Sequence, residues 1–140
     1  MDYISTKSSL NGRIAIPGSK SHTIRAVLMA ALADGESHLI DPLGSSDTEA
    51  ALHVYGALGT RFELGEKEWV VHGSGGHFDL PDTPLDVGNS GTTLRVALGS
   101  LALCKNGETI ITGDAQIQQR PSQPLVDALN ELGADISSEH

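Results

Sequence analysis

Apolar side chains recur at helical spacing in two separate stretches of the chain. In both stretches they stand at positions i, i+3, i+4, i+7 and i+8, the stripe of a helix that buries one face. In the first stretch these positions are Ile24, Val27, Leu28, Ala31 and Leu32. In the second they are Leu94, Ala97, Leu98, Leu101 and Ala102, each 70 residues further along. The spacing predicts two amphipathic helices that correspond to each other.

The segments on either side of these two helices also correspond. A short extended segment that breaks at glycine precedes each helix, residues 16–21 in the first case and 86–91 in the second. A glycine stop and a strand-like run follow each helix, within residues 33–40 and 105–112. We therefore expect the order strand, helix, strand twice in the chain.

A second helix follows in both copies and closes on Leu-Gly, within residues 48–64 and 124–137. In the first copy the chain then turns at residues 65–68, and residues 69–73 have the pattern of a returning strand. The second copy has no such return before the last residue. We expect one complete unit and one truncated unit.

These patterns predict an α/β (α+β) fold built from a repeated unit of strand, helix, strand, helix and hairpin. The first unit would cover about residues 13–80 and the second about residues 85–140. Two amphipathic helices can resemble each other by chance. A repeat is favoured because glycines recur at matched places, which pair Gly18 with Gly88, Gly35 with Gly107, and Gly59 with Gly133.

Charge then limits the partners. The 140 residues include 18 acidic and 9 basic side chains, for a net charge of −9. Nucleic acid or an anionic membrane surface would need a basic face, so neither is expected as the main partner. A small anion is still possible, because exposed charges farther away than about 8 Å are largely screened at physiological ionic strength.

The single cysteine and the start of the chain indicate the compartment. Cys104 has no partner for an internal disulfide, which favours a reducing environment, and it lies in an apolar helical pattern as a buried small hydrophobe. The first residues lack the pattern of a signal peptide, and the longest apolar run, residues 26–33, is too short to span a bilayer. We therefore expect a cytoplasmic protein.

The first loop-to-helix junction, residues 18–25, gathers groups that bind anions. The first backbone N–H groups of a helix lack partners and carry the positive end of the helix dipole. Gly18 lets the backbone approach a ligand, Ser19 and Ser21 add hydroxyl donors, and Lys20 and Arg25 add positive charge. The pattern predicts a local site for phosphate or carboxylate.

The second junction, residues 88–95, has neutral donors in place of the lysine. These are Asn89, Ser90, Thr92 and Thr93, and Arg95 corresponds to Arg25. The alternative at both junctions is that these residues only cap the helix, since Asn, Ser and Thr are good N-caps. The nucleotide-binding P-loop pattern fails, because its Gly-Lys-Ser/Thr sequence is interrupted in Gly18-Ser19-Lys20.

Three further features concern charged residues and histidines. Arg120, in the sequence QQRPSQPL, either is solvated ahead of a helix or reaches the same anion as the second junction. Asp47 and Glu49 are interpreted as a helix cap and dipole complement. The six histidines show no metal-ligand spacing, and no metal or organic cofactor is expected.

Three motifs in this order, IPGSKSHTIRAVLMAALADGES, DVGNSGTTLR and QQRPSQPLVDAL, resemble the 5-enolpyruvylshikimate-3-phosphate (EPSP) synthase family over nearly the whole chain. The resemblance implies a fold of repeated βαβαββ units. It also implies transfer of the enolpyruvyl group of phosphoenolpyruvate to the 5-hydroxyl of shikimate 3-phosphate, in the pathway to aromatic amino acids. No cofactor takes part in that reaction.

The resemblance also implies roles for individual residues. Lys20 and Arg120 would contact phosphoenolpyruvate as catalytic groups, and Gly91 would line the pocket where the inhibitor glyphosate also sits. Ser21 and Arg25 would hold shikimate 3-phosphate. The neutral donors of the second junction and its arginine complete the expected substrate-binding set, namely Asn89, Thr92 and Arg95.

Members of this family are much longer than 140 residues. The chain would therefore be the N-terminal part of such an enzyme, completed by a C-terminal part in cis or as a separate chain, and inactive alone. Residues 3–16 would associate with that missing part. Two alternatives remain open, the related UDP-N-acetylglucosamine enolpyruvyl transferase and a stand-alone anion-binding or assembly module.

Overall fold

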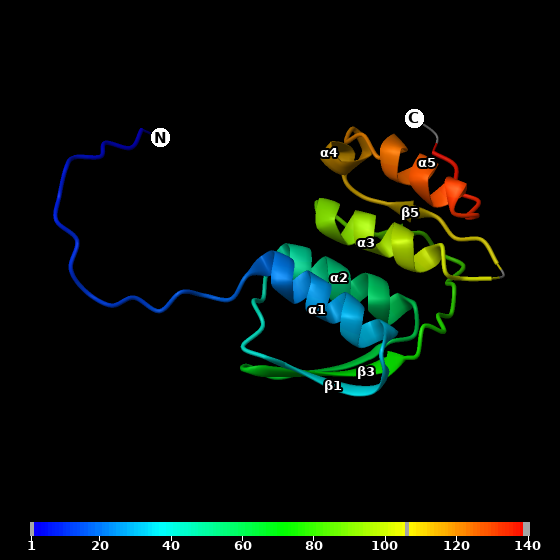
Figure 1. Cartoon of the computed structure of the whole chain (residues 1–140), viewed down its shortest axis with the longest axis horizontal. Coiled ribbons are helices and arrows are strands. Elements are labelled where there is room, and N and C mark those ends of the chain that lie inside the picture. Colours follow the sequence, from blue (N-terminus) through cyan, green and yellow to red (C-terminus); the bar gives the residue numbers. More distant parts are fainter. Residues whose placement is uncertain (1, 106, 139–140) are drawn as a thin grey trace.

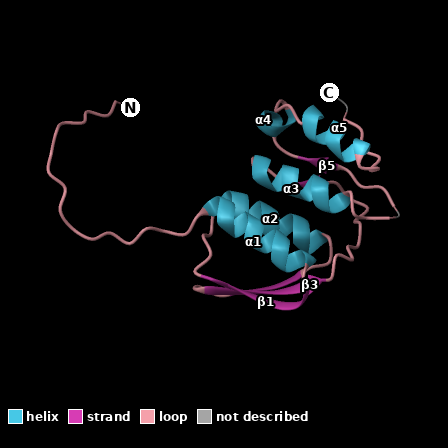
Figure 2. Cartoon of the chain, in the orientation of Figure 1, coloured by secondary structure: helices cyan, strands magenta, loops and turns pink. Residues whose placement is uncertain are grey.

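The computed structural model describes residues 2–105 and 107–138, and its helices and strands form successive layers (Figure 1). The first half contains α1 (Lys20–Leu32), β1 (Asp34–Ile40), α2 (Ser46–Ala57), β2 (Arg61–Leu64) and β3 (Glu68–Ser74). The three strands form an antiparallel sheet in the order β1-β3-β2. Helices α1 and α2 cover one face of this sheet (Figure 2).

The second half contains β4 (Leu85–Asp86), α3 (Gly91–Leu101), β5 (Ile111–Thr112), α4 (Ala115–Gln118) and α5 (Gln123–Glu131). Strands β4 and β5 pair in parallel and form a separate two-stranded sheet. Figure 1 shows α3 between this sheet and the α1–α2 layer, with α5 on the far side of β5. The parallel pairing follows from the helix that connects the two strands.

The two predicted apolar stripes form the centre of the core. Ile24, Val27 and Ala31 of α1 are fully buried, and Ala97 of α3 is as well. The last positions of each stripe, Leu32 and Leu101 among them, are only partly buried. The sequence prediction of two amphipathic helices is therefore confirmed, and their apolar faces pack into one cluster together with residues of α2.

A buried polar contact joins α2 to α3. The hydroxyl groups of Tyr55 and Ser100 lie 2.8 Å apart, and Ser100 donates to the carbonyl of Val96 at 3.1 Å. Because the serine has a single proton, the tyrosine is the donor in the pair. Burial raises the pKa of Tyr55 to about 12.

The segment before α1 differs from the prediction. Residues 2–19 contain neither helix nor strand, and they extend away from the body of the protein (Figure 1). Apolar side chains along this segment are largely exposed, including Tyr3 at 89% and Leu10 at 94%. The expected extended segment at residues 16–21 therefore gives way to α1 at Lys20, without a strand before it.

Several boundaries in the second half also differ. The predicted helix within 124–137 begins at Gln123 and ends at Glu131. Of the strand-like run 105–112, residue 106 lies outside the described residues, and the others form a strand only at Ile111 and Thr112. Cys104 lies beyond the end of α3 and is partly buried, so its placement within a helix was wrong. Burial raises the pKa of its thiol.

Glycines at matched places share a backbone conformation in two of the three pairs. The φ angles are +94° at Gly35 and +93° at Gly107, and +95° at Gly59 and +100° at Gly133. Only glycine adopts this left-handed region without strain, which explains why the residue recurs. The repeat itself, with its boundaries near residues 80 and 85, stays a prediction.

Candidate functional site at the helix starts

Helices α1, α2 and α3 begin at the same edge of the molecule (Figure 1). Two contacts to Asp47, in the first turn of α2, connect the three starts. Lys20 Nζ of α1 lies 3.0 Å from Asp47 Oδ2, and Thr93 Oγ1 of α3 donates to the Asp47 carbonyl at 3.3 Å. The positive ends of three helix dipoles therefore meet at one edge, which favours a bound anion there.

The first junction begins at a tight backbone approach. A Cβ atom on Gly18 would lie 3.0 Å from the Asp41 carbonyl oxygen, so only glycine fits without a shift of the neighbouring chain. Ser19 is the N-cap of α1, and its side chain accepts a long 3.4 Å hydrogen bond from the His22 N–H. Capping of α1 by Ser19 is therefore confirmed. This contact is not evidence for or against anion binding at the first junction.

The cations of the first junction are held by local contacts. Lys20 pairs with Asp47, and both side chains are partly exposed. The Arg25 guanidinium donates from Nη1 to the Ser21 carbonyl at 2.9 Å. Because an ammonium group has three donors and a guanidinium five, both side chains keep donors for a ligand while making these contacts.

The interpretation of Asp47 as a cap was wrong. The N-cap of α2 is Ser45, which forms a reciprocal capping box with Thr48. Asp47 and Glu49 lie in the first helical turn, so the part of the interpretation that concerned the helix dipole agrees with the structure.

The second junction brings two arginines to one glycine. Gly91 is the first residue of α3 and is buried, and Ser90 is the N-cap. A Cβ on Gly91 would lie 2.9 Å from Arg120 Nη1 and 3.1 Å from Arg95 Nη1, while Arg95 also donates to the Gly91 carbonyl at 3.0 Å. Of the two alternatives for Arg120, the structure favours the one in which it lies at the second junction.

The short helix α4 places Arg120, and the sequence interpretation missed it. Asp114 is its N-cap and accepts hydrogen bonds from the N–H groups of Gln116 and Ile117. Ile117 is buried, and its carbonyl accepts from the Arg120 N–H. An aspartate directly before Ala-Gln-Ile is a typical N-cap signal and could have predicted the helix.

Asn89 supports this arrangement from the second junction. Its side-chain amide donates to Asp114 at 2.6 Å and to Gln116 at 2.9 Å. The bond from Asn89, and after it the backbone bond from Ile117, lower the pKa of the Asp114 carboxyl. Thr92, the remaining predicted donor, is partly buried in the first turn of α3.

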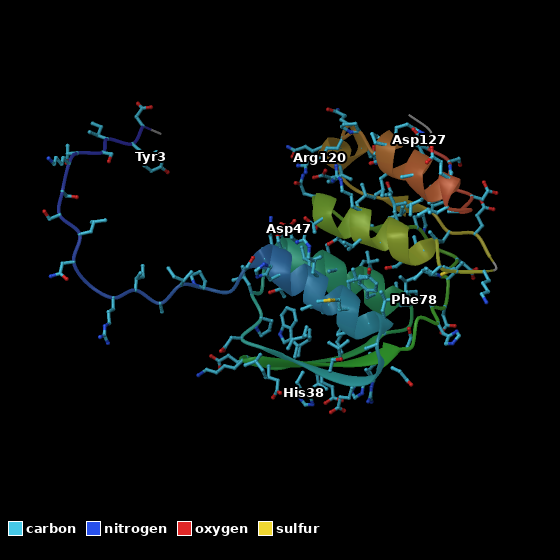
Figure 3. The ribbon with its side chains drawn as sticks, viewed as in Figure 1. Tyr3, His38, Asp47, Phe78, Arg120 and Asp127 are labelled. Atoms are coloured by element: carbon cyan, nitrogen blue, oxygen red, sulfur yellow. The ribbon has the colours of Figure 1, made fainter. Side chains whose placement is uncertain are left out.

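The predicted residues therefore fall into two groups that Asp47 links. Lys20, Ser21 and Arg25 belong to the start of α1. Gly91, Arg95 and Arg120 lie at the start of α3. Figure 3 shows the labelled Asp47 and Arg120 on the edge from which the segment before α1 departs.

A hollow of about 300 Å³ lies beside α1 and the end of β1. Gly18, Ser19 and His22 line it on one side, and His38 and Asp41 on the other. It shares Gly18 and Ser19 with the first junction, but the four cations of the two junctions do not line it. Within residues 2–105 and 107–138, no group of three or more His, Cys, Asp or Glu side chains could hold a metal ion. Among these residues no helix is both long and apolar enough to cross a membrane.

Known proteins are similar to this chain over nearly its whole length. Residues 4–140 match the family model described as EPSP synthase (3-phosphoshikimate 1-carboxyvinyltransferase). A 3-phosphoshikimate 1-carboxyvinyltransferase of Acetivibrio thermocellus is 48% identical over 132 residues, which are 94% of this chain and 31% of that protein. One of Methanothermobacter thermautotrophicus is 46% identical over 139 residues, 99% of this chain and 33% of that protein.

A solved structure of the same family also resembles this chain in its backbone. EPSP synthase from Acinetobacter baumannii matches with a TM-score of 0.85 at 30% identity, over 92% of this chain and 29% of that one. The chain thus spans about a third of the length of the curated relatives that it matches.

Proposed function

This chain belongs to the EPSP synthase family, and on that premise we propose that it is the N-terminal part of a 3-phosphoshikimate 1-carboxyvinyltransferase. The whole enzyme would transfer enolpyruvyl from phosphoenolpyruvate to the 5-hydroxyl of shikimate 3-phosphate and release phosphate. This chain would contribute binding and orientation of the two anionic substrates.

One observation carries the proposal. The start of α3, with two guanidinium groups at Gly91, is connected through Asp47 to the lysine at the start of α1. Charge-assisted hydrogen bonds contribute about 1.5–3 kcal/mol each, so three or four that converge on one ligand can overcome the acidic net charge of the chain.

Phosphoenolpyruvate is the substrate that we assign to Lys20 and Arg120. Both cations would bind its anionic groups, and they would stabilise the negative charge that gathers on the phosphate as its bond to carbon breaks. Gly91 would lie against the same substrate, since it leaves room between Arg95 and Arg120. The Lys20 ammonium can keep its contact with Asp47 in this role.

Shikimate 3-phosphate is assigned to the first junction. Ser21 and Arg25 would hold its phosphate. Both lie in the first two turns of α1, near the positive end of the helix dipole, and a hydroxyl and a guanidinium are both donors to phosphate oxygens. Thr92 would add a neutral donor from the second junction. Asn89 would have to exchange one of its present partners, Asp114 or Gln116, to reach a substrate directly.

The rest of the enzyme would complete the site. Because the relatives are about three times as long as this chain, we propose that a further part, in cis or as a separate chain, supplies the proton-transfer groups and more phosphate ligands. The exposed apolar side chains of residues 2–19 would contact that part. The lone cysteine is consistent with the cytoplasm as its compartment.

A chimeric enzyme tests this function. The chain would replace the matching third of the Acetivibrio thermocellus relative, and phosphate release from phosphoenolpyruvate and shikimate 3-phosphate would be measured. We expect turnover by the chimera, loss of turnover in its Lys20→Ala variant, and none by the chain alone. A folded chimera without activity, or steady turnover by the chain alone, would contradict the proposal.

A further inference from the structure

Two threonines hold the segment that connects the two junctions. This connecting segment, residues 41–47, runs from the end of β1 into the first turn of α2. Thr23 of α1 accepts a hydrogen bond from the Leu43 N–H at 3.0 Å, and Thr93 of α3 donates to the Asp47 carbonyl at 3.3 Å. Both threonines are buried, at 6% and 0% exposure.

The two threonines occupy corresponding places. They stand 70 residues apart, the same offset that relates the two apolar stripes, and each lies in the first turns of its helix. Thr93 also accepts from Ser90 Oγ at 2.8 Å, which ties it to the N-cap of α3. One end of the connecting segment is therefore fixed to α1 and the other to α3.

Further contacts hold the connecting segment along its length. Asp41 adopts a left-handed φ of +47°, and its N–H donates to the Lys67 carbonyl at 2.7 Å. Between the two threonine bonds, the Ser45 N–H donates to Thr48 Oγ1 at 2.8 Å. Leu43 packs on Gly18, where an added Cβ would come within 3.4 Å of both its Cβ and its N atom. A rigid spacer of this kind passes a displacement at one end to the other.

We propose that Thr23 and Thr93 are positioning residues that fix the separation of the two junctions through residues 41–47, so that both face one pair of bound substrates. Neither hydroxyl contacts a substrate in this role. Lys20 is placed directly by the segment, because its ammonium pairs with the Asp47 side chain while Thr93 holds the Asp47 backbone. The substrate part of this inference rests on the proposed function.

The coupling can be tested without a ligand. In the isotope-labelled chain, Thr23→Val keeps the shape of the side chain and removes the acceptor for Leu43. We expect its amide shift changes to extend through Asp47 to Gly91 and Thr92, and those of Thr93→Val to reach Lys20 and Ser21. Changes confined to the junction of each substitution would overturn the inference. Thr23→Val alone decides the question if Thr93→Val does not fold.

Substrate binding gives the second readout. We expect Thr23→Val to weaken shikimate 3-phosphate binding about tenfold, and Thr23→Ser, which keeps the hydroxyl, to restore it to within about twofold. Equal binding by wild type and Thr23→Val would overturn the inference. Absence of binding by wild type would instead count against the proposed function in the isolated chain, and the shift changes above would still test the spacer.

Discussion

Each junction contains a glycine in close contact, and the two glycines serve different ends. At Gly18 the group that blocks a side chain is a backbone carbonyl, that of Asp41. At Gly91 the blocking groups are the tips of two long side chains, Arg95 and Arg120. A backbone in a packed turn yields only with loss of stability, whereas a guanidinium group can move aside. We therefore expect Gly18 to matter for the stability of the fold and Gly91 for binding at the candidate site.

The largest effect on stability is expected for Gly18→Ala. Its Cβ would push against the Asp41 carbonyl and the Leu43 backbone, and overpacking of this kind costs about 1–3 kcal/mol. Urea unfolding measures the loss. Gly44→Ala is the matched control, in the loop that Gly18 contacts, because a Cβ there meets nothing within 4 Å. Equal stability of Gly18→Ala and wild type would remove the contrast between the two glycines.

The next effect concerns the contact that joins α2 to α3. Ser100→Ala leaves the buried Tyr55 hydroxyl without a partner, which costs about 1–3 kcal/mol. Tyr55→Phe combined with Ser100→Ala removes both polar groups, so the double variant should be more stable than the sum of the two single changes predicts. The free energies of unfolding of wild type, the two single variants and the double variant form a double-mutant cycle. Strict additivity would mean that the pair does not couple the helices.

Gly91→Ala should weaken ligand binding while leaving the stability of the fold nearly unchanged. Its Cβ displaces the tips of Arg95 and Arg120, so the free energy of unfolding should change by no more than about 0.5 kcal/mol. In the chimeric enzyme, binding of phosphoenolpyruvate and of glyphosate should weaken, with the larger loss for glyphosate. Inhibition and saturation curves measure both. A large loss of stability with unchanged binding would reverse the roles assigned to the two glycines.

The smallest effect concerns His38, an exposed residue of β1. Hydrogen bonds with Glu68, and after it Glu36, raise the pKa of His38 above its ordinary value of 6.5. The folded chain therefore binds this proton more tightly than the unfolded chain. The resulting stability is fully present below about pH 6.5 and is lost as the pH rises through the raised pKa.

His38→Gln should flatten the dependence of stability on pH above about pH 6.5, measured by urea unfolding at several pH values. Because His38 is exposed, the change should be small, and substrate binding should not follow it. An unchanged profile would show that the two glutamates do not hold the protonated ring in solution.

Local patterns were sufficient to predict much of the fold. The stripes of α1 and α3 were recognised because burial of one helix face imposes a spacing that any sequence must show. The returning strand at residues 69–73 was predicted from the turn at residues 65–68 that precedes it, and it is part of β3. The strands of the second half are shorter than predicted, because strand length depends on the pairing partner rather than on the strand's own residues.

The site was only partly predictable for the same reason. The types of residue at each junction indicated an anion, but the Lys20–Asp47 pair spans 27 positions in the sequence and no local pattern indicates it. The position of Arg120 beside Gly91 depends on α4, whose four residues are too few for a helical period. Contacts between distant segments are set by packing, which the sequence does not display directly.

The measurement that tests the central claim most directly is an NMR titration of the isotope-labelled chain with shikimate 3-phosphate and phosphoenolpyruvate. The backbone amides of residues 18–25 and 88–95 would be followed together. If the two junctions form one site, both sets shift with a common saturation curve, and Arg25→Ala or Arg95→Ala weakens both. Two unrelated curves, or shifts at one junction that ignore substitution at the other, would contradict the claim.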